Sequence, residues 1–235
     1  MPLYEGKAKQ VFATDNPAVL RVYYKDDATA FNAEKRGTIV GKGEVNNLMS
    51  AVLYEELAQH GVPNHFVELT SNREQLVKAL NMFKLEVIMR NRTAGSFAKR
   101  YGVAEGEELS PNLFELSYKE DALGDPPINE DAAIALGLVT PEELATIKTL
   151  TQQVNAYLQQ RFHSASMILV DFKLEFGKDA EGNVLLGDEI SPDTCRLWDV
   201  ETGEKLDKDR FRRDLGNVAE AYNEVLARLG IERLA

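Results

Sequence analysis

The 235-residue sequence contains one cysteine, three histidines and no long apolar run. A single cysteine excludes a disulfide within the chain, and the scattered histidines do not have the spacing of a zinc site. A membrane-spanning helix needs about 20 apolar residues in succession, and the first residues do not have the pattern of a secretory signal. We therefore expect a cytoplasmic protein with no membrane partner.

Basic residues are in deficit, because 27 lysines and arginines stand against 38 aspartates and glutamates, for a net charge of −11. Such a chain is not expected to bind nucleic acid through its general surface. An anionic substrate must instead be met by a local cluster of basic side chains. The sequence also lacks repeats and obvious flexible linkers, and its length suits one large domain or two small lobes.

The order of the expected elements indicates an α+β fold. Hydrophobic periodicity predicts three N-terminal strands and three long helices, over about residues 3–4, 9–13, 18–24, 44–60, 140–162 and 218–229. Thr140 should cap the longest helix, with Pro141 in its first turn and Glu143 completing a capping box. Strands that precede helices without regular alternation are typical of α+β rather than doubly wound proteins.

The region from residue 64 to residue 92 is compatible with two interpretations. Ser71 with Glu74 resembles a capping box, which would begin a helix. Residues 76–80 and 85–89 instead suit a hairpin that turns through Asn81. We expect the hairpin.

A strand with a charged face is predicted over residues 169–177. Strict alternation places Asp171, Lys173 and Glu175 on one face and aliphatic or aromatic side chains on the other. Such a face is either a solvated sheet surface or the wall of a site for a charged ligand.

A second segment, residues 186–198, favours the ligand site. As a regular strand it would place Asp188 on an otherwise apolar face, where a carboxylate is costly unless a cation or several donors meet it. A bulge at Gly187 could instead turn Asp188 to solvent. Two neighbouring strands that offer aspartate and glutamate are typical of a place that holds Mg²⁺ against phosphate oxygens.

Basic side chains near glycines suggest two phosphate contacts. Gly6 would let backbone amides approach a phosphate, with Lys7 and Lys9 on one side of a strand, although lysines on an edge strand also prevent aggregation. Arg90 shares a strand face with Arg92 and precedes Ser96, which should cap a short helix. Guanidinium groups and free helical amides form a phosphate cradle, and the alternative is an ordinary surface strand.

Short sequence strings along nearly the whole chain occur in the order in which one enzyme family has them. They are residues 3–9, 41–47, 90–96, 170–177, 187–193, 196–199 and 207–211. On these strings the chain resembles the SAICAR synthetase (phosphoribosylaminoimidazole-succinocarboxamide synthase) family. Thr194 and Cys195 replace the small pair that the family often has, and residues 29–36 follow one bacterial subtype. Residues 25–45 therefore receive no site assignment.

The resemblance implies an ATP-dependent ligase that joins L-aspartate to carboxyaminoimidazole ribonucleotide in purine biosynthesis, giving the succinocarboxamide, ADP and phosphate. It implies a smaller β-rich N-terminal lobe, residues 1–83, and a larger α+β lobe, residues 84–235, with ATP in the cleft between them. ATP and Mg²⁺ are the implied cofactors, and a homodimer is the implied assembly.

The resemblance also implies roles for individual residues. The implied nucleotide-binding residues are Lys7, Lys9, Met82, Lys119, Glu175 and Asp188. Glu175 and Asp188 are the implied metal ligands. The implied ribonucleotide-binding residues are Arg90, Ser96, Arg196 and Arg212. Asp125, Asp171 and Lys173 match catalytic positions.

Two other functions are compatible with the residues alone. A magnesium-dependent small-molecule kinase would use the same carboxylates and lysines but would transfer phosphate to a hydroxyl, so its ATP turnover would not require aspartate. A non-catalytic nucleotide-binding or scaffold protein would tolerate the loss of Asp188.

Overall fold

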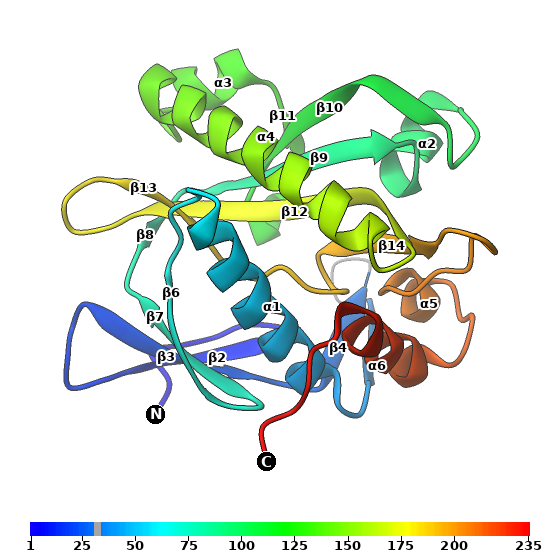
Figure 1. Cartoon of the computed structure of the whole chain (residues 1–235). Coiled ribbons are helices and arrows are strands. Elements are labelled where there is room, and N and C mark those ends of the chain that lie inside the picture. The colour runs from blue at the N-terminus through cyan, green and yellow to red at the C-terminus, as the bar shows by residue number, and fades with distance from the viewer. Residues whose placement is uncertain (31–33) are drawn as a thin grey trace.

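An antiparallel sheet built from the N-terminal residues forms one side of the molecule. In the computed structural model, which describes residues 1–30 and 34–235, its strand order is β1-β2-β3-β7-β6 (Figure 1). The strands are β1 Tyr4–Glu5, β2 Lys9–Ala13, β3 Val19–Tyr24, β6 Phe66–Ser71 and β7 Glu74–Lys78. The three strands predicted before residue 25 are confirmed, because each is set by local alternation and bounded by turn residues.

A small two-stranded sheet and a long helix follow the first three strands. The strands are β4 Asp27–Ala30 and β5 Lys35–Thr38, and the helix is α1 Lys42–Gln59, which confirms the helix predicted over 44–60. Residues 31–33 of the subtype stretch lie outside the described residues. Helix α1 packs against β3, β6 and β7 and also supplies side chains to the main core, so it lies between the two larger sheets (Figure 1).

The hairpin predicted through Asn81 is wrong. Strand β7 pairs with β3 and β6, whereas β8 Asn81–Met82 and β9 Leu85–Arg92 both pair with strand β12, Met167–Lys178, in another sheet. Ser71 and Glu74 face each other across the β6–β7 turn and do not begin a helix. Val77 packs with Val22 in a small cluster, and Val87 belongs to the main core, so the chain changes sheets between them.

The second large sheet contains seven strands in the order β11-β10-β9-β12-β13, with β8 and β14 also paired to β12. Its remaining strands are β10 Glu108–Tyr118, β11 Pro127–Ile128, β13 Val184–Gly187 and β14 Cys195–Asp199. Strand β12 shows the predicted alternation of a charged and an apolar face. The side chains of Asp171 and Glu175 are nevertheless buried, so that face is not a solvated surface.

Helices cover the second sheet and close the C-terminal side. They are α2 Gly95–Tyr101, the 3-10 helix η1 Asp121–Leu123, α3 Glu130–Ala135, α4 Pro141–His163, α5 Asp209–Arg212 and α6 Val218–Leu229. Thr140 caps α4 in a complete capping box, as predicted. The prediction that Ser96 caps α2 is wrong, because Ala94 holds the capping position and Ser96 lies in the first turn. None of the helices in the described ranges 1–30 and 34–235 combines the length and apolar character needed to cross a membrane.

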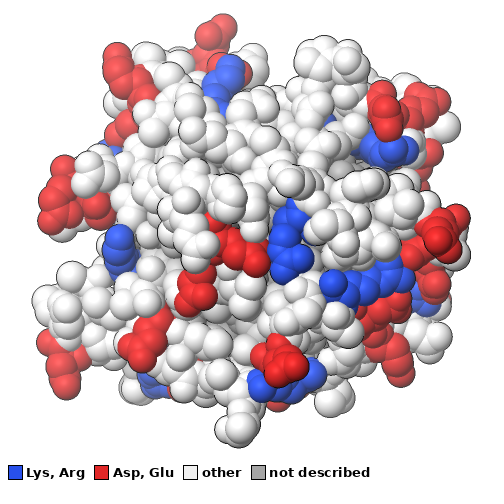
Figure 2. Space-filling model, in the orientation of Figure 1, with Lys and Arg blue, Asp and Glu red and all other residues white. Residues whose placement is uncertain are grey.

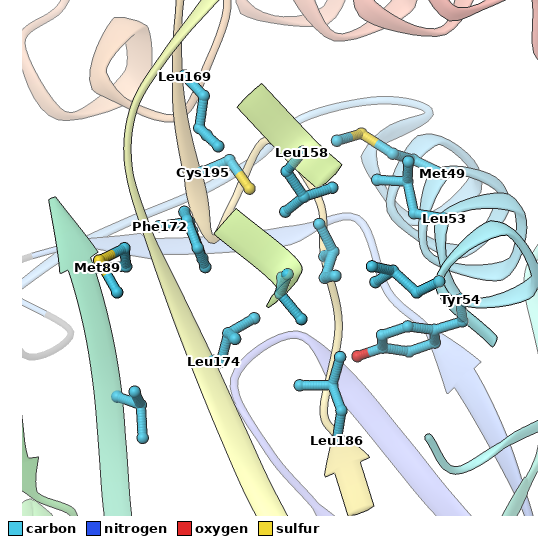
Figure 3. Close-up of a cluster of buried hydrophobic side chains, with 14 of the residues drawn as sticks. Met49, Leu53, Tyr54, Met89, Leu158, Leu169, Phe172, Leu174, Leu186 and Cys195 are labelled. Atoms are coloured by element: carbon cyan, nitrogen blue, oxygen red, sulfur yellow. The ribbon is translucent and has the colours of Figure 1, made fainter. Parts of the chain in front are cut away.

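The main core fixes β12 in place. Figure 3 shows Leu158 of α4 between the side chains of α1 and those of β12. Leu158, Phe172 and Leu174 are almost completely buried, and each such side chain contributes about 1.5–3 kcal/mol of burial free energy. Cys195 is part of the same core, where burial raises the pKa of its thiol. One face of β12 is thereby held rigidly while its charged face borders the site.

Candidate active site

A cavity of about 1260 Å³ is lined by residues from both large sheets. Its wall includes β1 to β3 and β7 on one side and β12 with the loop after β13 on the other. Figure 2 shows acidic side chains spread over the visible face of the molecule, with the basic ones mostly beside them. The cavity gathers several lysines against carboxylates, which provides the local basic cluster that an acidic protein needs for an anionic ligand.

Lys173 and Lys9 stand at the centre of the cavity wall with Asp188 and Glu175. The Lys173 Nζ lies 2.6 Å from Glu175 Oε1 and 3.1 Å from Asp188 Oδ2. Lys9 forms an ion pair with Asp188 and a second one, 2.8 Å long, with Glu189 Oε2. Lys119 pairs with the other oxygen of Glu175. The structure therefore brings together five of the predicted nucleotide and catalytic side chains.

The groups in this cluster hold one another in their charged forms. Burial disfavours the charge of Lys173, but Asp188 and Glu175 outweigh it and raise the pKa of the lysine well above its usual value. Burial likewise opposes the charge of Asp188, yet Lys173 and Lys9 keep its pKa well below the ordinary range. Carboxylates and ammonium groups that are both charged at neutral pH suit a site for a metal ion and phosphates.

Asp188 does not continue strand β13 as a regular strand would. Its backbone has a φ of +56°, in the left-handed region, and the strand ends at Gly187. The prediction that Asp188 shares an apolar strand face is therefore wrong, and its carboxylate turns into the cavity. Tyr54 donates a hydrogen bond of 2.6 Å to the Gly187 carbonyl, and the His65 ring contacts the Asp188 backbone. These contacts fix the turn.

The first hairpin and residue Met82 border another part of the cavity. Lys7 lies on the exposed rim, where its Nζ is 3.0 Å from Asp121 Oδ1, whereas Lys9 points inward. Met82 lines the wall next to two glycines, Gly177 and Gly187. A Cβ on Gly177 would come within 2.9 Å of the Met82 sulfur, so glycine is what allows this close approach.

Asp125 is the third predicted catalytic residue, and it lies at the cavity wall. Its backbone has a φ of +50°, and its carboxylate accepts a hydrogen bond of 2.9 Å from the Glu120 amide. The carboxylate therefore stabilises the turn that follows η1 as well as facing the cavity.

Three of the four predicted ribonucleotide residues, Arg90, Arg196 and Arg212, form a chain of ion pairs with two aspartates. Asp171 Oδ2 accepts from Arg90 Nη1 at 2.8 Å and from Arg196 Nη1 at 2.9 Å. Arg196 Nε donates to Asp209 Oδ2 at 2.9 Å, and the other oxygen of Asp209 pairs with Arg212 at 2.7 Å. Burial opposes the charge of Asp209, but Arg196 and Arg212 lower its pKa to about 2.

Only the last member of this chain reaches the large cavity. Arg212 lines the cavity, whereas Arg90, Asp171, Arg196 and Ser96 are not among its lining residues in the described part of the chain. Ser96 lies exposed on α2. Gly95 of the same helix has a φ of +54°, and a Cβ there would stand 2.3 Å from Arg196 Nη2. The α2 turn is thus fitted closely to the Arg196 guanidinium.

Several polar residues at the cavity and behind it had no sequence-based role, among them Lys42, His65, Glu189, Asp193 and Lys208. Lys42 lies behind the wall and pairs with Asp193. Burial lowers the pKa of the His65 ring to about 4, so the ring is neutral. One signal could have indicated Lys42, because polar residues recur on the buried side of α1, including Asn46, Asn47 and Ser50.

Comparison with known proteins gives one consistent result. A profile of the SAICAR synthetase family matches residues 2–229. Phosphoribosylaminoimidazole-succinocarboxamide synthase of Desulfitobacterium hafniense is 60% identical over 227 residues, which cover 97% of this chain and 95% of the relative. The enzyme of that name from Clostridium botulinum strain Eklund 17B is 55% identical over 97% of both chains.

Solved structures agree with the sequence comparison. The crystal structure of this synthase from Ehrlichia chaffeensis superposes with a TM-score of 0.97 at 44% identity and covers 100% of both chains. The structure of a SAICAR synthetase in complex with ADP superposes with a TM-score of 0.95 at 44% identity and covers 99% of both chains. The family profile, the relatives and the solved structures each match nearly the whole chain, and the fold is α+β. The chain therefore belongs to the SAICAR synthetase family.

Proposed function

We propose that this chain is an ATP-dependent carbon–nitrogen ligase that condenses L-aspartate with carboxyaminoimidazole ribonucleotide and releases ADP and phosphate. Its family membership supports this activity, and so does the ADP complex of a relative with 44% identity. The structural observation that carries the proposal is the cluster of Lys9, Lys173, Glu175 and Asp188 in the cavity. Such a cluster positions and neutralises phosphate groups.

The nucleotide occupies the part of the cavity bordered by the first hairpin and Met82. Met82 lines the adenine pocket, and Lys7, Lys9 and Lys119 neutralise the phosphates. In this proposal residues 1–83 act as the lobe that covers the nucleotide, and residues 84–235 carry the metal and ribonucleotide sites. The support is the lining of the cavity by both segments.

Glu175 and Asp188 are the proposed ligands of Mg²⁺. Their oxygens fit this ion, which is usually bound by one or two carboxylates and completes its shell with phosphate oxygens and water. In residues 1–30 and 34–235 no group of three or more acidic, histidine or cysteine side chains is arranged to hold a metal ion, so the protein would supply only part of the shell. When bound, the ion would neutralise charge on the transferred phosphoryl group.

The ribonucleotide is held by Arg90, Ser96, Arg196 and Arg212. The ion pairs to Asp171 and Asp209 fix the guanidinium groups in place before the substrate arrives, which lowers the entropy lost on binding. Asp171 acts as a positioning group for Arg90 and Arg196. Lys173 and Asp125 face the reacting carboxylate.

The chemistry requires activation of a poor electrophile. An oxygen of the substrate carboxylate attacks the γ-phosphorus of ATP, and the bond to the ADP oxygen breaks. The aspartate amine then attacks the carbonyl carbon of the acyl phosphate, loses a proton and expels inorganic phosphate. Lys173 stabilises the negative charge on the carboxylate oxygens in both steps. One labelled carboxylate oxygen should therefore appear in phosphate.

The test is ADP release by the purified chain with magnesium ATP, carboxyaminoimidazole ribonucleotide and L-aspartate, each omitted in turn. We expect release only with all three and a succinocarboxamide product by mass spectrometry. Release with the ribonucleotide but without aspartate would favour the kinase alternative, and no release would favour a binding protein. Absence of ¹⁸O transfer into phosphate would contradict the acyl phosphate.

The proposed homodimer and the proposed cytoplasmic location are further predictions. Sedimentation equilibrium measures the assembly, and a sedimenting mass of a single chain would contradict the dimer. Fractionation of the source cells measures the location.

A further inference from the structure

Part of the cavity wall consists of Asp193 and Lys208, which have no role in the reaction as described so far. Asp193 lies in the loop between β13 and β14, and Lys208 directly precedes α5. Both line the same cavity as Lys173 and Asp188. The Lys173 amide donates a hydrogen bond of 2.8 Å to the Thr194 carbonyl, so this loop is tied to the strand that bears the central lysine.

Asp193 is a fixed anion whose oxygens already have partners. Its Oδ2 accepts from Lys42 Nζ at 2.8 Å, and its Oδ1 accepts from the Tyr222 hydroxyl at 2.6 Å. The Lys42 side chain is 0% exposed and that of Asp193 is 6% exposed. Burial opposes the charge of Asp193, but Lys42 and Lys208 hold its pKa well below the usual range. Both oxygens of this carboxylate are therefore bound by side chains in the interior of the protein.

Lys208 also lies near the Asp193 carboxylate but does not form a hydrogen bond with it. Its Nζ lies 3.7 Å from Asp193 Oδ2, beyond hydrogen-bond length, and its side chain is 15% exposed. Burial lowers the pKa of Lys208, and Asp193 only partly offsets this effect. Two ammonium groups thus share the Asp193 carboxylate, and Lys42 is the one that holds it at hydrogen-bond distance. A charge in such a place is costly until an anion meets it.

The neighbouring Arg212 differs from Lys208 because it has a carboxylate at hydrogen-bond distance. It follows Lys208 by one helical turn, since its amide donates to the Lys208 carbonyl at 3.0 Å, and it also lines the cavity. Its guanidinium pairs with Asp209 at 2.7 Å, whereas the partner that would neutralise Lys208 is taken by Lys42. Of these two cations, Lys208 is therefore the one without a carboxylate at hydrogen-bond distance.

We propose that Lys208 anchors a carboxylate of the L-aspartate substrate, with Asp193, Lys42 and Tyr222 as the positioning groups behind it. This inference rests on the proposed ligase function. A single positive charge matches one carboxylate, whereas phosphate monoesters are met by several donors or by guanidinium forks. Because Lys173 and Lys208 line the same cavity, an amino acid anchored at Lys208 would share that cavity with the group that Lys173 contacts.

The first test compares Lys208→Met with Lys208→Arg in steady-state kinetics. Loss of one charge-assisted contact should raise the KM for L-aspartate roughly 10- to 100-fold. The KM values for ATP and the ribonucleotide should stay within about twofold, and Lys208→Arg should recover part of the aspartate affinity. Lys148→Met is the matched control, because Lys148 pairs with Glu130 on an exposed face and does not line the cavity.

A second measurement uses the unmodified protein and does not depend on how a variant folds. Succinate, which has both carboxylates of aspartate but no amine, should slow the acetylation of Lys208 by acetic anhydride several-fold, as read by mass spectrometry. Acetylation of Lys148 should not change.

Each outcome decides the proposal. An unchanged aspartate KM in Lys208→Met, a rise confined to the ribonucleotide or ATP, or an unchanged rate of Lys208 acetylation with succinate would overturn the anchor. Absence of aspartate-dependent ADP release in the unmodified chain would overturn the ligase function itself, so the two failures are distinct.

Discussion

The ammonium group of Lys9 on β2 forms an ion pair with the carboxylate of Asp188, which lies 179 residues further along the chain. This contact joins the five-stranded sheet to the loop that leaves the seven-stranded sheet. It places a lysine and a carboxylate from different sheets at the same point of the cavity wall. The pair therefore links the two sheets at the point where we propose that the nucleotide phosphates bind.

Asp188→Asn should abolish the ligase activity while leaving the fold intact. The amide has no negative charge for Lys9, Lys173 or a magnesium ion, so we expect kcat to fall at least about 100-fold. Initial rates of ADP release measure the loss, and circular dichroism checks the fold. Asp131→Asn, at an exposed position on α3, is the control. Retained activity in Asp188→Asn would contradict its assignment as a metal ligand.

Gly95→Ala should weaken ribonucleotide binding. The new methyl group would stand 2.3 Å from Arg196 Nη2, and the φ of +54° adds a backbone cost of about 1 kcal/mol. We expect the KM for the ribonucleotide to rise more than the KM for ATP. Gly137→Ala separates the two effects, because Gly137 has a φ of +69° and no atom within 4 Å of the added Cβ. Equal kinetic effects of both variants would exclude the proposed role of the Arg196 contact.

Asp209→Asn should lower stability in a manner that depends on pH. The folded pKa of about 2 lies below the unfolded value near 4, so the carboxylate stabilises the fold above pH 4, and this stabilisation is lost as pH falls toward 2. We expect the free energy of unfolding of Asp209→Asn to be roughly 2 kcal/mol lower than that of the parent at pH 7. This difference should narrow between pH 4 and pH 2. Urea unfolding of both proteins across this range measures it. A deficit that does not change with pH would show that the ion pairs to Arg196 and Arg212 are not its cause.

Leu158→Ala should destabilise the protein without a specific effect on the site. The side chain is completely buried between α1 and β12, and its truncation typically costs about 2–5 kcal/mol. Thermal or chemical unfolding measures the loss, while KM values at a temperature where the variant is folded should match the parent. Leu136→Ala, at an exposed site, should have little effect.

Local patterns were sufficient to predict much of the fold. Alternation gave the strands before residue 25 and the two faces of β12, and the Thr140 capping box gave the start of α4. These features depend on residues that are neighbours in sequence. The α+β class followed from their order, and residue patterns also indicated eight of the proposed site residues. The other five, Met82, Lys119, Asp125, Arg196 and Arg212, came from the family resemblance.

Contacts between residues that are far apart in the sequence could not be predicted from such patterns. The residues of β7 alone do not indicate whether this strand pairs with β9 or with β3. It pairs with β3 because Val77 packs in the small cluster with Val22, which lies far away in the sequence. The left-handed turn at Asp188 depends on Tyr54 and His65, which hold its backbone from other elements. The pair of Lys42 with Asp193 likewise has no sequence signal that links its two halves.

The buried pair of Lys42 and Asp193 also has a consequence for synthesis on the ribosome. The two residues are separated by 151 positions, so at about 5–20 residues per second roughly 8–30 s pass between their additions to the chain. During this interval the ammonium group of Lys42 has no carboxylate to accompany it into the interior, and α1 cannot take its final place between the sheets. The burial of Lys42 with its partner therefore waits until Asp193, in the last third of the chain, has been translated.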